Sequence, residues 1–94
     1  MIVVRLAGAL RGFAGDTAEI RLDGSARTVA EALALLWVKA PALRDRVVSE
    51  TGDVRRHINV FAGSESIRDR DGIATLLRDG EELFLAPAVS GGSL

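Results

Sequence analysis

One long helical pattern, from Thr28 to Lys39, lies between two groups of short strand patterns. Its apolar residues recur every three or four positions, as in an amphipathic helix: Val29, Leu33, Leu36 and Trp37. Thr28 and Glu31 have the spacing of a capping box, and Ala40-Pro41 should end the helix. A chain of 94 residues can hold one core. We therefore expect this helix to cover one face of one sheet.

Strand patterns with alternating apolar residues stand on both sides of the helix. Ile2, Val4 and Leu6 should face inward from the first strand. Pro87 cannot donate to a ladder, so pairing should stop there. The five predicted strands are Ile2 to Ala7, Ala18 to Leu22, Ile58 to Ala62, Glu65 to Ile67 and Glu82 to Ala86, with Ile20, Leu22, Leu83 and Leu85 inward in the second and last.

The connections carry weaker patterns. We expect Ala9 to Asp16 to be a loop with Leu10 and Phe13 beneath it, and Leu43, Val47 and Val48 to belong to a shorter helical stretch before Gly52. Ile73 to Leu77 should form a short turn of helix. A hairpin, a crossing helix and returning strands favour an α+β β-grasp (ubiquitin-like) fold, with a mixed four- to five-stranded sheet and one main helix across one face. A ferredoxin-like fold is the alternative.

Composition excludes several classes of function. With no cysteine, the chain has no disulfide, thiolate metal site or thiol nucleophile. A net charge of −1 predicts no nucleic-acid partner, and the lack of a long apolar run predicts no membrane span and no signal peptide. These features fit a cytoplasmic protein.

No conventional active site is readable. His57 is the only histidine, and Asp69 and Asp71 lie in an alternating charge run typical of a solvated turn. We therefore predict no catalytic residue, no metal and no bound cofactor. Arg44, Arg46, Arg55 and Arg56 are read as a solvated face, with partner docking as the alternative.

The end of the chain carries the most specific motif. From Asp79 to Gly92 it reads Asp-Gly-Glu-Glu-Leu-Phe-Leu-Ala-Pro-Ala-Val-Ser-Gly-Gly. This stretch resembles the C-terminal signature of the MoaD/ThiS family of ubiquitin-like sulfur carriers. Supporting likenesses span nearly the whole chain: Leu6 to Arg11, Thr28 to Leu33 and Ile58 to Phe61. Gly72 to Leu76 and Pro87-Ala88-Val89 look most like the carriers that serve cysteine synthesis.

This resemblance implies a carrier and not an enzyme. An activating enzyme would use ATP to adenylate the carboxylate of Gly92, sulfur would displace AMP, and a sulfur-accepting biosynthetic enzyme would receive the sulfur. Two other functions stay open: a ubiquitin-like modifier conjugated to lysines, and a β-grasp interaction module whose tail is never activated. The chain itself has one lysine, Lys39.

The predicted organisation is a β-grasp domain at 1–87 and a flexible tail at 88–94. The tail residues Val89, Ser90, Gly91 and Gly92 would enter the partner, since glycine has no side chain to block a narrow channel. Fixing six tail residues costs on the order of 6–12 kcal/mol, so the folded domain needs its own docking patch. From strand alternation and the resemblance, we assign that patch to Phe61, Phe84, Ala86 and Arg11.

Two residues depart from the family pattern, because Ser93 and Leu94 follow the diglycine. The Gly92 carbonyl is then an amide and offers no carboxylate to adenylate. We expect cleavage between Gly92 and Ser93, and the resemblance implies a zinc metalloprotease of the kind that trims ubiquitin-like tails.

Overall fold

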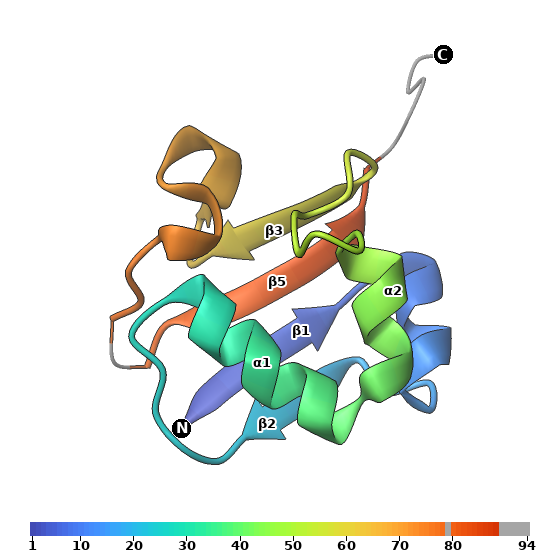
Figure 1. The fold of residues 1–94 in the computed structure, drawn as a ribbon. Coiled ribbons are helices and arrows are strands. Elements are labelled where there is room, and N and C mark those ends of the chain that lie inside the picture. Colours follow the sequence, from blue (N-terminus) through green and yellow to red (C-terminus); the bar gives the residue numbers. More distant parts are fainter. Residues whose placement is uncertain (79, 89–94) are drawn as a thin grey trace.

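Five strands form one mixed sheet in the computed structural model, which describes residues 1–78 and 80–88 (Figure 1). The spatial order is β2-β1-β5-β3-β4. β1 and β5 are parallel, and the other neighbours are antiparallel. The strands are β1 (Ile2–Leu6), β2 (Glu19–Leu22), β3 (Ile58–Ala62), β4 (Glu65–Ser66) and β5 (Glu82–Pro87). This is the ubiquitin-like β-grasp, as the sequence predicts, and not the ferredoxin-like alternative.

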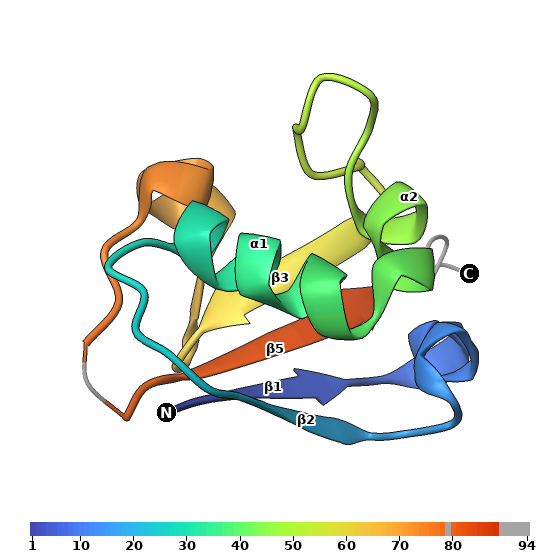
Figure 2. The same cartoon turned by 60° about the horizontal axis from the view of Figure 1, so that its bottom comes forward.

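The helix α1 (Val29–Lys39) crosses one face of the sheet (Figure 2). Its start is a capping box: the Glu31 amide donates to the Thr28 hydroxyl over 3.2 Å, and the Glu31 carboxylate accepts from the Arg27 amide over 2.9 Å. Val29, Leu33 and Leu36 are buried under the helix, and Trp37 is half-buried. The short helix α2 (Arg44–Val47) lies on the same side of the sheet.

The core fills the space between α1 and the sheet. Alternation in the strands decides which side chains enter it, because successive residues point to opposite faces. The predicted inward positions of β1, β3 and the last strand are all buried: Ile2, Val4, Leu6, Ile58, Val60, Leu83 and Leu85. In β2, Leu22 is buried but Ile20 is only half-buried, because β2 is an edge strand.

Four 3-10 helices occupy the connections: η1 (Gly8–Ala14), η2 (Pro41–Leu43), η3 (Ile67–Asp69) and η4 (Gly72–Ala74). The predicted loop at 9–16 is therefore wrong in detail, because η1 fills most of it. Leu10 is buried beneath η1, and Phe13 is half-buried under the Arg46 guanidinium, 4.4 Å from the ring centroid.

Several other boundaries differ from the sequence prediction. β1 ends at Leu6 and not at Ala7, and β2 begins at Glu19 and not at Ala18. The helical stretch near Leu43 ends at Val47, because Val48 is extended and forms a bridge with Val54. The turn expected at 73–77 is η4 followed by extended backbone, where the Thr75 carbonyl accepts from the Val29 amide over 3.0 Å. β4 stops at Ser66, since Ile67 begins η3.

Candidate functional site

Two aromatic side chains lie side by side on the sheet face opposite α1. Phe61 of β3 and Phe84 of β5 are direct partners in the antiparallel ladder. Their ring centroids are 6.1 Å apart and the rings are tilted by 42°. Both are half-buried. The alternation that buries Leu83 and Leu85 turns Phe84 outward, as the sequence predicts.

Ala86 extends this face along β5 toward the C-terminus. It is half-buried, pairs with Asn59 and points to the same side as Phe84 because it lies two positions further along the strand. We call Phe61, Phe84 and Ala86 the aromatic face. It leads from the middle of the sheet to the end of β5, where the described part of the chain ends at Ala88.

A row of charged side chains borders the aromatic face on the side of β1 and β2. The Arg5 Nε donates to a Glu82 carboxylate oxygen over 2.8 Å, and an Arg5 terminal nitrogen lies 3.3 Å from a Glu19 oxygen. Arg21 in turn donates to Glu19 over 3.2 Å. The hydrogen bond from Arg5, together with its charge, lowers the pKa of Glu82, and the same bond raises the pKa of Arg5. These exposed pairs give the face a polar rim with alternating charge.

The last contacts before the tail correct one prediction, that pairing stops at Pro87. Pro87 pairs with Ile58, and the Ala88 amide still donates to the His57 carbonyl over 2.6 Å. The register explains why the proline is tolerated. In an antiparallel pair only every second pair of residues exchanges hydrogen bonds. The bond from the Ala88 amide to His57 O and the 2.9 Å bond from the Gly63 amide to Glu82 O show that the bonded pairs involve the odd-numbered residues of β3, whereas Pro87 pairs with Ile58. Pro87 therefore occupies a position that donates no hydrogen bond to β3.

Gly8 lies against Pro87 on the other side. Its φ of +60° favours glycine, and a Cβ added there would lie 3.3 Å from Pro87 Cγ. η1 therefore begins in close contact with the end of β5. His57 thus bonds to Ala88 on one side of the chain, and Gly8 contacts Pro87 on the other, where the tail begins.

Arg68 holds the segment that contains His57. Its guanidinium donates to Ile58 O and to the Asn59 side-chain oxygen, each over 2.8 Å, and to Arg55 O over 2.9 Å, with a longer contact of 3.3 Å to Arg56 O. Sequence reasoning missed this residue, because Arg68 belongs to the alternating charge run that reads as a solvated turn. Nothing in the local pattern distinguishes it from Arg70, whose ion pair with Glu65 is 3.7 Å long.

The remaining predicted residues are Arg11, the tail residues and the arginine group. Arg11 is exposed on η1 at the end of the sheet and is not in a row with Phe61 and Phe84. The tail residues Val89, Ser90, Gly91, Gly92 and Ser93 lie outside the described residues. The arginine group is partly used within the fold, since Arg46 covers Phe13 and Arg55 donates to Asp45 O over 2.8 Å.

Residues 1–78 and 80–88 contain no group of three or more histidine, cysteine or acidic side chains placed to hold a metal ion. Over the same residues, no helix is long and apolar enough to span a membrane.

Comparison with known proteins gives consistent matches. Residues 4–92 match the ThiS family. Small archaeal modifier protein 1 of Haloferax volcanii is 40% identical over 76 residues, covering 81% of this chain and 82% of the relative. The sulfur carrier protein CysO of Mycobacterium tuberculosis is 26% identical over 93 residues, covering 97% and 98%. The crystal structure of the Amycolatopsis orientalis BexX/CysO complex contains a chain that superimposes with a TM-score of 0.85 at 28% identity, covering 98% of this chain and 100% of that one.

Proposed function

The chain belongs to the ThiS family, and from this membership we propose that it is a sulfur carrier whose C-terminal Gly92 is converted to a thiocarboxylate. Its similarity to sulfur carriers and small protein modifiers supports a carrier rather than an enzyme. The structural observation that supports the proposal is the aromatic face, which runs along β5 toward the C-terminal end of that strand.

The proposed chemistry has two steps. The Gly92 carboxylate attacks the α-phosphate of ATP on an activating enzyme, which forms an acyl-adenylate and releases pyrophosphate. Hydrosulfide supplied by a partner then attacks the activated carbonyl carbon, AMP leaves with the bonding electron pair, and the thioacid loses its proton to give the thiocarboxylate. Adenylation is needed because a carboxylate is a poor electrophile. The chain itself binds no cofactor in this scheme, since ATP belongs to the partner.

The aromatic face would supply the binding energy that two glycines lack. Half-buried aromatic side chains bordered by a polar rim have the composition of a protein interface. A partner that covers Phe61, Phe84 and Ala86 would lie next to the end of β5, with Pro87 and Ala88 aligned by Gly8 and His57. Arg11, on the adjacent η1, would contact the margin of such a partner.

Two kinds of enzyme would share this surface in turn. The activating enzyme needs it to load sulfur, and the sulfur-accepting biosynthetic enzyme needs it to unload sulfur. The existence of a BexX/CysO complex supports docking between a carrier of this fold and a partner protein. The resemblance of Gly72 to Leu76 and of Pro87 to Val89 to the carriers of cysteine synthesis favours that pathway for the acceptor.

Trimming must come first in this scheme. Ser93 and Leu94 follow Gly92, so a peptidase must cleave after Gly92 to create the carboxylate. A metalloprotease that recognises the same tail would perform this step.

Pyrophosphate release tests the proposal. The form ending at Gly92 and the form ending at Leu94 are each mixed with the activating enzyme encoded in the same cell and with ATP. We expect pyrophosphate from the Gly92 form only. No release from the Gly92 form, with an enzyme that activates its own established carrier, would contradict the proposal.

Protein modification is the second candidate, favoured by the similarity to small archaeal modifier protein 1. A conjugate would join the Gly92 carbonyl to a lysine of another protein. Arg78 is the last basic residue, so trypsin would leave the segment Asp79 to Gly92 on the modified lysine. Mass spectrometry of cell extracts for that branched remnant distinguishes the modifier from a carrier that only transfers sulfur.

A further inference from the structure

The two edges of the sheet are covered to different extents. On the β3 edge, β4 pairs with Phe61 and Ala62, and the Arg68 guanidinium binds the carbonyl of Ile58. β2 forms the other edge, and it borders a groove. An edge strand with free backbone groups is a template for pairing with another chain.

The register identifies the free groups on β2. Ile2 pairs with Leu22 and Val4 with Ile20, and the Leu6 amide donates to Ala18 O over 2.8 Å, so the even positions of β2 bond to β1. The N–H and C=O groups of Glu19 and Arg21 therefore point away from the sheet. Of these four groups, Arg21 O is the one with a partner among the described residues: it accepts from the Lys39 ammonium over 2.8 Å.

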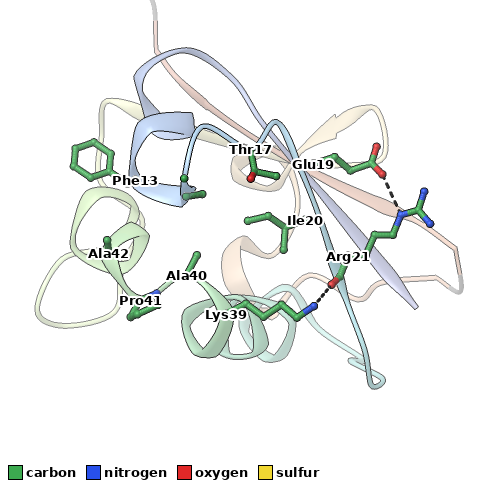
Figure 3. A pocket seen from close by; sticks show the side chains of 11 residues that line it. Phe13, Thr17, Glu19, Ile20, Arg21, Lys39, Ala40, Pro41 and Ala42 are labelled. Atoms are coloured by element: carbon green, nitrogen blue, oxygen red, sulfur yellow. Dashed lines mark hydrogen bonds and ion pairs between the residues drawn. The ribbon is translucent and has the colours of Figure 1, made fainter.

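The groove beside this edge has a volume of about 490 Å³ (Figure 3). Its lining is mixed. Thr17, Glu19, Arg21 and Lys39 contribute polar groups, and the apolar part comes from η1, β2, the end of α1 and η2: Phe13, Ala14, Ile20, Ala40, Pro41 and Ala42. Figure 3 shows Ile20 and Ala40 pointing toward the space between the elements, with Lys39 and Arg21 together at one end.

The charged groups at that end of the groove differ in whether an oppositely charged group already binds them. The Glu19 carboxylate is already bound by both Arg5 and Arg21. Lys39 makes one hydrogen bond to a neutral carbonyl and has an ammonium with three donors. The end of the groove near Lys39 therefore complements a negative side chain.

We propose that the outer edge of β2 binds an extended, acidic–apolar peptide segment of a partner protein. The segment adds to the sheet as a further strand, bonding Glu19 and Arg21 through its backbone. Every second side chain then faces the groove and contacts Ile20, and an aspartate or glutamate lies beside Lys39. Lys39 exchanges its bond to Arg21 O for this carboxylate, which leaves the carbonyl free to accept from the peptide.

This site is separate from the activation of Gly92. β1 lies between β2 and β5, so a peptide on the β2 edge leaves Phe61, Phe84 and the end of β5 accessible. Peptide binding and pyrophosphate release can therefore fail independently of each other.

A synthetic peptide tests the proposal on the full chain. The probe has a central strand of about six residues in which valine alternates with threonine, followed by two aspartates. Its control carries a proline in the centre. Titration into the isotopically labelled protein should shift the amide signals of Glu19 and Arg21 and slow their hydrogen exchange, while the proline peptide should have no effect.

Variants separate backbone pairing from side-chain contacts. Arg21→Pro removes one outward N–H and leaves the bonds to β1, whereas Arg21→Thr loses the same guanidinium and keeps the N–H. We expect about threefold to tenfold weaker binding for the proline variant than for the threonine variant. Ala42→Phe fills the groove without altering the edge and should also weaken binding. Lys39→Gln should weaken binding of the aspartate peptide but not of the same peptide with two asparagines.

Three results would overturn the proposal. The first is no shift at Glu19 and Arg21 up to the solubility limit of the peptide. The second is a set of shifts confined to the aromatic face. The third is concentration-dependent dimerisation through β2, which would make a second copy of the chain the occupant.

Discussion

The Ala88 amide donates to the His57 carbonyl over 2.6 Å, one residue beyond the proline that closes β5. This bond ties the start of the tail to the segment before β3. Gly8 contacts Pro87 from the opposite side. The strand that carries Phe84 and Ala86 is therefore held on both sides up to Ala88, where the described part of the chain ends.

Phe84→Ala should weaken recognition by the activating enzyme. The change removes one ring of the pair with Phe61, so we expect about a tenfold rise in KM for the Gly92 form with a smaller change in kcat. Val38→Ala is the matched control, since Val38 is 82% exposed on α1, on the covered side of the sheet. Steady-state pyrophosphate release measures both. Equal KM values for Phe84→Ala and the unmodified chain would remove the aromatic face from the docking surface.

Gly8→Ala should destabilise the fold by about 1–2 kcal/mol, because the new Cβ meets Pro87 and the positive φ disfavours alanine. Gly12→Ala is the control within the same 3-10 helix, since a Cβ there has no neighbour within 4 Å. Urea unfolding followed by circular dichroism gives both free energies of unfolding. If Gly12→Ala cost as much as Gly8→Ala, the contact with Pro87 would not be the cause.

Arg68→Lys should loosen the His57 segment while keeping the charge. Lysine cannot reproduce the planar fork that binds Ile58 O and Asn59 together, so we expect a loss of about 1–2 kcal/mol. Amide hydrogen exchange should accelerate at Ala88 more than at Leu85, in the centre of β5. Arg70→Lys is the control, because Arg70 makes only a long ion pair with Glu65. Similar exchange at Ala88 in both variants would show that Arg68 does not hold this segment.

Glu82 should titrate below the ordinary range of glutamate. Arg5 lowers its folded-state pKa, so the contribution of the pair to stability is present above the ordinary glutamate pKa and is lost as pH falls through the lowered value. Arg5→Met should return the Glu82 pKa toward normal, and Arg21→Met should leave it unchanged, because Arg21 pairs with Glu19. Carboxyl carbon chemical shifts measured between neutral and acidic pH check this. A Glu82 titration curve unaffected by Arg5→Met would contradict the assignment.

The parts of the fold that follow from local chemistry could be predicted from the sequence. The Thr28–Glu31 capping box and the alternation of Leu83, Phe84 and Leu85 predicted where α1 begins and which side of β5 is buried. Both depend on the period of a single element. Alternation also predicted that Phe61 and Phe84 face outward, but their direct pairing across β3 and β5 is known only from the structure.

The rest depends on contacts between distant segments. Pro87 stays in the ladder because the hydrogen bonds between β3 and β5 are made at alternate positions, as the bonds of Ala88 and Gly63 show, and Pro87 lies at a position between them. The sequence of β5 alone does not determine which positions bond. Arg68 binds carbonyls ten or more positions away, and its role is invisible in an alternating charge run. Lys39 was noted in the sequence as the only lysine, but its bond to Arg21 O depends on where α1 ends relative to β2.

Intact mass after reconstitution tests the central claim most directly. The form ending at Gly92 is incubated with the activating enzyme, ATP and a sulfide donor, beside the form ending at Leu94. We predict that the mass of the Gly92 form rises by the difference between one sulfur and one oxygen, and that the Leu94 form is unchanged. An unchanged Gly92 form, in a mixture that converts another carrier, would contradict the assignment of this chain as a sulfur carrier.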